Sequence, residues 1–187
     1  LYQRAVMIRK LSPSILVTLS FLAVIFTGAV CLKLPFALEN GVSFRWIDSL
    51  FISTSATCVT GLSPIDVGST FSKFGEVVII LLMQIGGLGV MVLSSYFYLT
   101  LGRNLSIRQK LLIQETFAGD YEVNWRTLVR TVIHYVFIIE GVGALALSVL
   151  FLPRMSISDS IYYGIFHAVS AFCNAGLALF SDSFISF

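Results

Sequence analysis

Three long apolar segments constrain the fold of this chain more than any other feature. They cover residues 14–34, 77–101 and 131–152, and the second contains no charged residue. A helix rises 1.5 Å per residue, so about 20 apolar residues cross the ~30 Å hydrocarbon core of a bilayer. Charged residues make up only 12% of the chain, against roughly 25% in soluble domains. We therefore expect an all-α membrane protein that crosses the lipid bilayer several times.

The basic residues predict how these spans are oriented. Those that precede the first span or lie in the 102–126 loop are Arg4, Arg9, Lys10, Arg103, Arg108, Lys110 and Arg126. On the opposite side lie Arg45, Lys73 and Arg154. Cytoplasmic loops of membrane proteins carry an excess of Lys and Arg. We therefore place the N-terminal segment 1–13 and the 102–126 loop in the cytoplasm, and the protein in the plasma membrane.

A short polar motif occurs twice between the spans. The stretch "SATCVTGL", which contains Gly61, resembles the later stretch "SAFCNAGL", which contains Gly176. The two align when Gly61 is superposed on Gly176. The first copy lies in segment 44–65, which is rich in hydroxyl side chains and contains Pro64, a helix breaker. If this segment crossed the membrane, the basic 102–126 loop would lie outside. A re-entrant segment, which dips in and returns to the same face, keeps the charge rule intact.

The repeat predicts two parallel pore units around one axis. Unit one, 14–101, comprises a span (14–34), a pore helix (45–56), a filter loop (57–62) and a return span (74–101). The cytoplasmic loop 102–126 follows. Unit two, 127–187, is incomplete and comprises a span (127–152), a pore helix (158–171) and a filter loop (172–177). Non-helical backbone at membrane depth is tolerated only where it is buried in protein or lines a watery cavity.

The composition of the two loops indicates cation chemistry. The carboxyl end of a pore helix carries partial negative charge, and loop carbonyls can replace the water around a cation. The glycines permit a positive φ, and threonine hydroxyls can add oxygen ligands. Neither loop has a ring of acidic side chains, which favours a monovalent ion over Ca²⁺. The candidate ion-filter residues are Thr57, Cys58, Val59, Thr60, Gly61, Phe172, Cys173, Asn174, Ala175 and Gly176.

Three motifs resemble those of a known family. "SATCVTGL", "QIGGLGVM" and "FHAVSAFCNAGL", in this order, are similar to the Trk/Ktr/HKT superfamily of potassium transporters, closest to the KtrB-type membrane subunit. The resemblance implies four pore units in one chain, arranged like a potassium channel, with K⁺ as the transported ion and Na⁺ as a coupling or activating ion. It also implies a homodimer and a cytosolic ring of nucleotide-binding RCK subunits of the KtrA type. Glycine at positions 61 and 176 implies K⁺ selectivity. This chain departs from the family by ending within its second unit.

Other interpretations of the chain are a multi-span carrier for another small solute, an intramembrane enzyme, or a structural scaffold subunit. No catalytic pair recurs at useful spacing, so we expect no enzyme and no covalent cofactor. The net charge of +2 is too small to indicate nucleic acid. Cys31, Cys58 and Cys173 have neither metal-site spacing nor a disulfide pattern, so no resident metal is expected.

Four further features leave alternatives open. "GGLG", beginning at Gly86, predicts close packing against a pore helix or local helix flexibility rather than a nucleotide loop. Glu140, in the third span, needs either a partner in a neighbouring unit or a place on the ion path. His134 and His167 are expected to be ordinary hydrogen-bonded residues. The 102–125 loop predicts a membrane-surface helix, a docking surface for a cytosolic subunit, or both.

Overall fold

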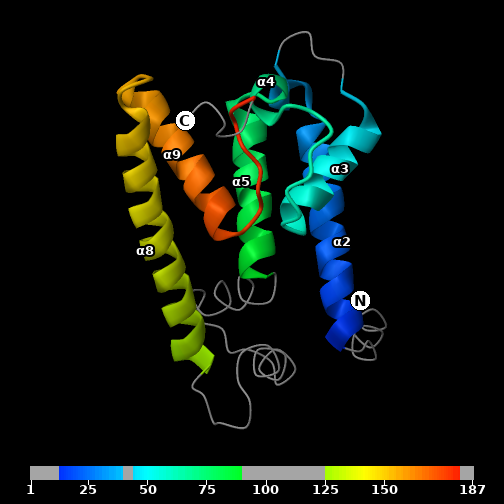
Figure 1. Ribbon diagram of the computed structural model, residues 1–187. Helices are drawn as coiled ribbons and strands as arrows, with labels where there is room; N and C mark the ends of the chain where they lie inside the picture. The colour runs from blue at the N-terminus through cyan, green and yellow to red at the C-terminus, as the bar shows by residue number, and fades with distance from the viewer. Residues whose placement is uncertain (1–12, 40–43, 90–124, 182–187) are drawn as a thin grey trace.

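The computed structural model describes residues 13–39, 44–89 and 125–181. Figure 1 shows their helices: α2 (Pro13–Leu32), η1 (Pro35–Ala37), α3 (Trp46–Thr57), α4 (Val67–Thr70), α5 (Lys73–Leu88), α8 (Trp125–Phe151) and α9 (Ile157–Phe172). No strand forms among the described residues, where a single antiparallel bridge joins Leu38 and Phe71. The expected all-α class is therefore confirmed for this part of the chain.

The outer surfaces of the longest helices are apolar. Within α8, Val129–Phe151 is long and apolar enough to cross a membrane, with a mean hydropathy of 1.9. Val17–Leu32 of α2 is apolar but shorter. Phe26 and Leu145 are among the large apolar side chains that lie exposed on these two helices. Such faces are costly in water and suit contact with lipid.

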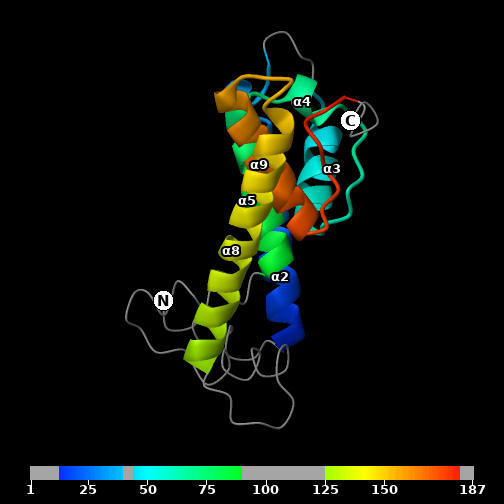
Figure 2. The same ribbon diagram turned by 60° about the vertical axis from the view of Figure 1, so that its left-hand side comes forward.

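The chain reverses direction after α3 and again after α9. Figures 1 and 2 show each of these helices starting toward the end of the molecule where α4 lies and running toward the middle. In each case an irregular segment then returns toward the end where the helix began. The helix bounds differ by one residue from the expected pore helices 45–56 and 158–171.

Serine hydroxyls and small residues hold α3 against α2. Ser53 Oγ donates to the Ile25 carbonyl at 2.6 Å, and Ser49 Oγ donates to the Ala29 carbonyl at 2.5 Å. A Cβ placed on Gly28 would lie 2.5 Å from Ser53 Oγ. Close approach through small residues is the usual way that membrane helices pack. The polarity of segment 44–65 therefore serves contacts inside the protein.

The same kind of packing joins α9 to α8. A Cβ added at Gly164 would lie closer than 3.0 Å to Ser148 Oγ, and 2.7 Å from the Ala144 carbonyl oxygen. Ser148 Oγ is already engaged, because it donates to the same carbonyl at 2.6 Å. Both long helices, α2 and α8, thus support a shorter helix through small side chains.

Helix α5 lies between the two helix pairs and contacts α2, α3 and α9. Near its start, Glu76 accepts a 2.5 Å hydrogen bond from the Tyr162 hydroxyl of α9. Lys73 Nζ lies 3.9 Å from the same carboxylate and 3.7 Å from the centre of the Tyr162 ring. This cluster fastens α5 to α9 at the end of the molecule where both helices begin.

Helix α5 ends at Leu88, where Gly89 adopts φ +76°. A positive φ is outside the helical region, so the α-helix stops there. The sequence indicated a continuous span to residue 101, and residues 90–101 lie outside the described part of the chain. So do segment 1–12 and most of the expected cytoplasmic loop 102–126.

At the start of α3, Arg45 and Asp48 form a bidentate ion pair. The Nε and Nη2 atoms of Arg45 each donate to one oxygen of Asp48 at 2.9 Å. The guanidinium holds the pKa of the Asp48 carboxyl below its usual value. An acidic residue in a first helical turn also interacts favourably with the helix dipole.

Candidate functional site

The segments that follow α3 and α9 have the same backbone conformation. We call residues 57–61 the first loop and 172–176 the second loop. In the first loop the amide of Thr60 donates to the Ser55 carbonyl at 3.0 Å. At the equivalent position, 115 residues later, Ala175 donates to Ser170 at 2.8 Å. Two further hydrogen bonds recur. The amide of Cys58 donates to the Thr54 carbonyl, as that of Cys173 does to Val169. The amide of Val59 donates to the Ala56 carbonyl, as that of Asn174 does to Ala171.

Backbone dihedrals repeat in the same way. Val59 and Asn174 have φ of 50° and 57°, and Gly61 and Gly176 have φ of 76° and 68°. The expected positive φ at both glycines is confirmed. Positive φ is uncommon in non-glycine residues and rare in a β-branched residue such as valine. Its recurrence at equivalent positions indicates a conformation that the surrounding structure imposes, as often happens at functional sites.

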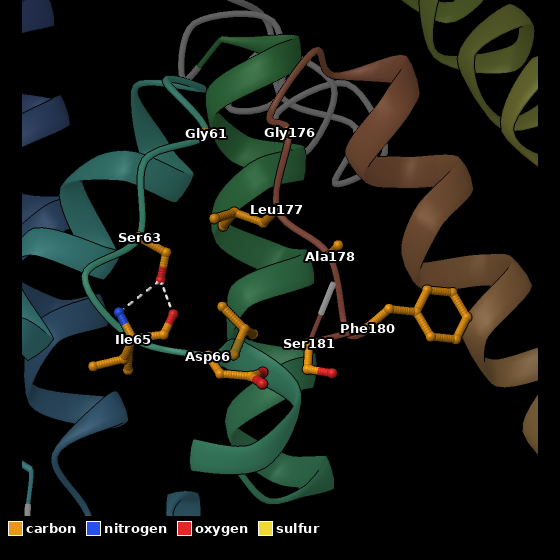
Figure 3. Close-up of a pocket in the computed structure, with 10 residues that line it drawn as sticks. Gly61, Ser63, Ile65, Asp66, Gly176, Leu177, Ala178, Phe180 and Ser181 are labelled. Atoms are coloured by element: carbon orange, nitrogen blue, oxygen red, sulfur yellow. Dashed lines mark hydrogen bonds between the residues drawn. The ribbon is translucent and has the colours of Figure 1, made fainter. Parts of the chain in front are cut away.

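The two loops meet at their glycines. A Cβ built on Gly61 would lie 2.7 Å from the Ala175 carbonyl oxygen and 3.3 Å from the Cα of Gly176. A Cβ on Gly176 would lie 3.3 Å from the Cα of Gly61. Figure 3 shows the two glycines facing each other across adjacent stretches of chain. Neither position has room for a side chain without displacement of the other loop.

The carbonyl groups of both loops lack protein partners in the described part of the chain. No hydrogen bond between described residues ends on a carbonyl oxygen of residues 57–61 or 172–176. By contrast, the carbonyls just before each loop, those of Ser55 and Ser170, accept bonds from loop amides. Most buried backbone carbonyls in proteins are paired. The acceptors of the two loops thus have no hydrogen-bond partner among the described residues, although the Thr57 carbonyl is packed against Gly86 of α5.

The hydroxyl groups of Thr57 and Thr60 differ in their hydrogen bonding. Thr60 Oγ1 donates back to α3, to the Ser55 hydroxyl at 3.1 Å and more weakly to the Ser55 carbonyl at 3.4 Å. Thr57 Oγ1 is buried and has no hydrogen-bond partner among the described residues. The carbonyl of Thr57, however, lies against Gly86 of α5. In the described structure the Thr57 hydroxyl thus lacks a partner, while its carbonyl is packed against α5.

A polar pocket of about 240 Å³ opens beside the paired glycines. Figure 3 shows it between the segment that leads from the first loop to α4 and the segment that follows the second loop. Its lining residues are Gly61, Ser63, Ile65, Asp66, Val67, Gly176, Leu177, Ala178, Phe180 and Ser181. Asp66 supplies a carboxylate, one oxygen of which accepts a 3.3 Å hydrogen bond from the Ser69 amide.

Sequence reasoning missed Asp66, Ser63 and Ser181 as site residues. They lie beyond the repeated motif, and the two copies differ at these positions. The signal that could have found Asp66 is that it is an acidic residue on the outer return of a re-entrant loop. Among the described residues, no group of three or more His, Cys, Asp or Glu side chains could hold a metal ion.

Two glycines of helix α5 pack closely against the two loops. A Cβ on Gly86 would lie closer than 3.0 Å to the Thr57 carbonyl oxygen. A Cβ on Gly87 would lie 2.6 Å from Cys173 Sγ and 2.9 Å from Cys173 Cβ. Close packing, one of the two interpretations of "GGLG", is thus confirmed at these two glycines.

Glu140 and the histidines all have hydrogen-bond partners. Gln84 of α5 donates its Nε2 to Glu140 Oε2 at 3.2 Å, so the partner of Glu140 lies on a helix of the other predicted unit. The Nδ1 of His167 lies 2.7 Å from the Tyr163 carbonyl, and its Nε2 accepts from the Leu179 amide at 3.2 Å. His134 Nδ1 lies 2.7 Å from the Arg130 carbonyl. The expectation of ordinary hydrogen-bonded histidines is confirmed.

Comparisons with known proteins give the family of this chain. Residues 6–187 match the TrkH family model, described as "Cation transport protein". The chain is 42% identical over 172 residues to Ktr system potassium uptake protein B of Vibrio alginolyticus, covering 92% of this chain and 37% of that relative. It is 35% identical over 178 residues to the potassium/sodium uptake protein NtpJ of Enterococcus hirae, covering 95% and 40%.

A third relative is Ktr system potassium uptake protein B of Bacillus subtilis. It is 36% identical over 178 residues, which cover 95% of this chain and 40% of the relative. The chain thus spans about two fifths of the length of these relatives. Their family is one of membrane cation transporters and not of enzymes. Because the family model covers nearly the whole sequence, the chain belongs to the TrkH family of cation transport proteins.

Proposed function

We propose that this chain forms two walls of a K⁺-selective pore, with the first and second loops as parts of its filter. The observation that carries the proposal is the pair of equivalent loops. They meet at Gly61 and Gly176, and their carbonyl oxygens accept no hydrogen bond from the described protein. Rings of backbone carbonyls are the usual means by which K⁺ filters replace the hydration shell of the ion.

Other features support a re-entrant pore unit. Helices α3 and α9 end at the loops, so their carboxyl-terminal partial charges stabilise a cation there. The polar pocket beside the glycines forms the outer entrance, and the buried Thr57 hydroxyl lies at the inner start of the first loop. The N-terminus and the 102–126 loop are cytoplasmic by their basic residues. Two further pore units, outside this chain, complete the ring.

The partners proposed for the full-length protein follow from the same family. They are a second copy of the protein and a cytosolic nucleotide-binding RCK ring that docks on the 102–126 loop, with Na⁺ as a coupling or activating ion. The names of two relatives, which place them in a "Ktr system", support a separate partner subunit. The 102–124 segment itself lies outside the described residues.

Ion flux through the purified full-length protein in liposomes tests the proposed function. We expect K⁺ and Rb⁺ to enter down their electrochemical gradients, with Na⁺ entering much more slowly. Empty liposomes and liposomes with heat-inactivated protein are the controls. Uptake of a neutral solute with no cation flux would instead favour the multi-span carrier, and absence of any flux would favour a scaffold subunit.

The outer pocket leads to a prediction about Asp66. Its carboxylate raises the local concentration of cations at the entrance, and this effect is screened by salt. Asp66→Asn should raise the KM for K⁺ by about twofold to fivefold at low ionic strength, the effect of one charge near a surface, and leave K⁺/Na⁺ preference unchanged. The measurement is Rb⁺ uptake against concentration at two ionic strengths. An unchanged KM at low salt would exclude Asp66 from the ion path.

A further inference from the structure

We propose that Gln84 is a positioning residue for the second loop, oriented by Glu140. The inference rests on the proposed function, because it assigns a selectivity role to residues that do not touch the ion. Gln84 lies in α5, Glu140 in α8, and Cys173 lies in the second loop directly after α9. One amide side chain thus connects three elements that are far apart in the sequence.

The geometry orients the Gln84 amide. The NH₂ group of Gln84 faces Glu140, with Nε2 3.2 Å from Glu140 Oε2, as suits an ionised carboxylate, which only accepts hydrogen bonds. The opposite end of the amide, Oε1, then faces Cys173, whose Sγ lies 4.0 Å away and is the donor of a weak S–H bond. Reversal of the amide would place oxygen against oxygen at Glu140. Glu140 thereby directs the acceptor of Gln84 toward the second loop.

The surroundings strengthen this bridge. Gln84 and Glu140 line a cavity of about 380 Å³ between α5, α8 and α9, and the other lining residues are apolar or glycine. Glu140 is 6% exposed, and its Oε1 has no hydrogen-bond partner among the described residues. Hydrogen bonds are electrostatically stronger in apolar surroundings than in water. Gln84 therefore provides the only hydrogen bond found for the Glu140 side chain within the described residues.

Cys173 is held on two sides by α5. Besides the Gln84 amide, the backbone at Gly87 lies against the Cys173 side chain, so that a Cβ added to Gly87 would lie 2.6 Å from Sγ. The equivalent residue of the first loop, Cys58, is exposed. A change in Gln84 should therefore displace the second loop specifically, three residues before Gly176, and so change the spacing of its carbonyls.

The test uses the full-length protein and compares K⁺/Na⁺ preference with protein abundance. We expect Gln84→Leu to reduce the preference about fivefold, the factor that one ordinary hydrogen bond supports. Gln84→Glu would place a second carboxylate against that of Glu140, and it should reduce the K⁺/Na⁺ preference at least as much. The exchanged pair Gln84→Glu with Glu140→Gln should restore it, because an amide again donates to a carboxylate.

A matched control separates positioning from general stability. Tyr162→Phe removes the 2.5 Å hydrogen bond to Glu76, which also joins α5 and α9 but lies away from the loops. This variant should lose stability with its ion preference unchanged. If Gln84→Leu behaves like Tyr162→Phe, or if the exchanged pair is not restored, the positioning role is wrong. A different result would contradict the proposed function itself: unchanged ion preference in Gly61→Ser and in Gly176→Ser.

Discussion

Gly61→Ser in the full-length protein is expected to reduce the preference for K⁺ over Na⁺ by at least about tenfold. A serine Cβ would lie 2.7 Å from the Ala175 carbonyl oxygen, in a backbone with φ of +76°. A change of about 1.4 kcal/mol in the relative binding free energy of the two ions corresponds to a tenfold change in preference. The second loop must move to relieve the contact, which changes the carbonyl spacing on both sides. Competing Rb⁺ and Na⁺ fluxes in liposomes measure the effect.

Gly89→Ser is the matched control for this experiment. Gly89 has the same φ of +76°, but a Cβ there would meet nothing within 4 Å among the described residues. The Gly89→Ser variant should therefore show the effect of backbone strain alone, which is a lower unfolding temperature with unchanged ion preference. Equal ion preference in wild type and Gly61→Ser would contradict the assignment of the first loop to the filter.

Gly86→Ala is expected to destabilise the protein by about 1–3 kcal/mol, the usual range for an overpacked core, and to abolish most K⁺ transport. The added methyl group would lie closer than 3.0 Å to the Thr57 carbonyl oxygen and 2.8 Å from the Thr57 carbonyl carbon. These atoms belong to backbone at the end of α3, so they cannot rotate away. Either α5 or the first loop must shift.

Gly141→Ala provides the comparison, since it makes the same change in α8 where a Cβ meets nothing within 4 Å in the described structure. Alanine is the better helix former by about 1 kcal/mol, so this variant should be neutral or slightly stabilising. Thermal unfolding and Rb⁺ uptake of both variants are the measurements. A Gly86→Ala protein that unfolds and transports like Gly141→Ala would show that α5 does not support the first loop.

Much of the fold was predictable because a helix that crosses a membrane needs a long run of apolar residues, and such runs can be recognised in the sequence. The helices α3 and α9 were predictable for a different reason: serine-rich, glycine-terminated stretches fit no span, and their repetition required one structure for both. The positive φ at Gly61 and Gly176 followed from the residue type. The same φ sign at Val59 and Asn174 did not, because neither residue requires it, and only the surrounding hydrogen bonds impose it.

The supporting contacts could not be predicted, because they depend on how helices far apart in the sequence pack. Glu140 required a partner, but nothing in the sequence selects Gln84, which lies 56 residues away. Asp66 lines the polar pocket only because the return segment of the first loop runs beside residues 176–181. The glycines of "GGLG" indicated close packing without indicating that Gly86 meets the first loop and Gly87 the second.

Anomalous diffraction from crystals of the full-length protein grown in Rb⁺ tests the central claim most directly. We predict Rb⁺ peaks within coordination distance of the carbonyl oxygens of residues 58–61 and 173–176, beside the paired glycines. Addition of Na⁺ at the same concentration as Rb⁺ should leave these Rb⁺ peaks in place, because Na⁺ does not displace an ion that the filter prefers. Rb⁺ bound elsewhere, with none between the two loops, would contradict their assignment as walls of the filter.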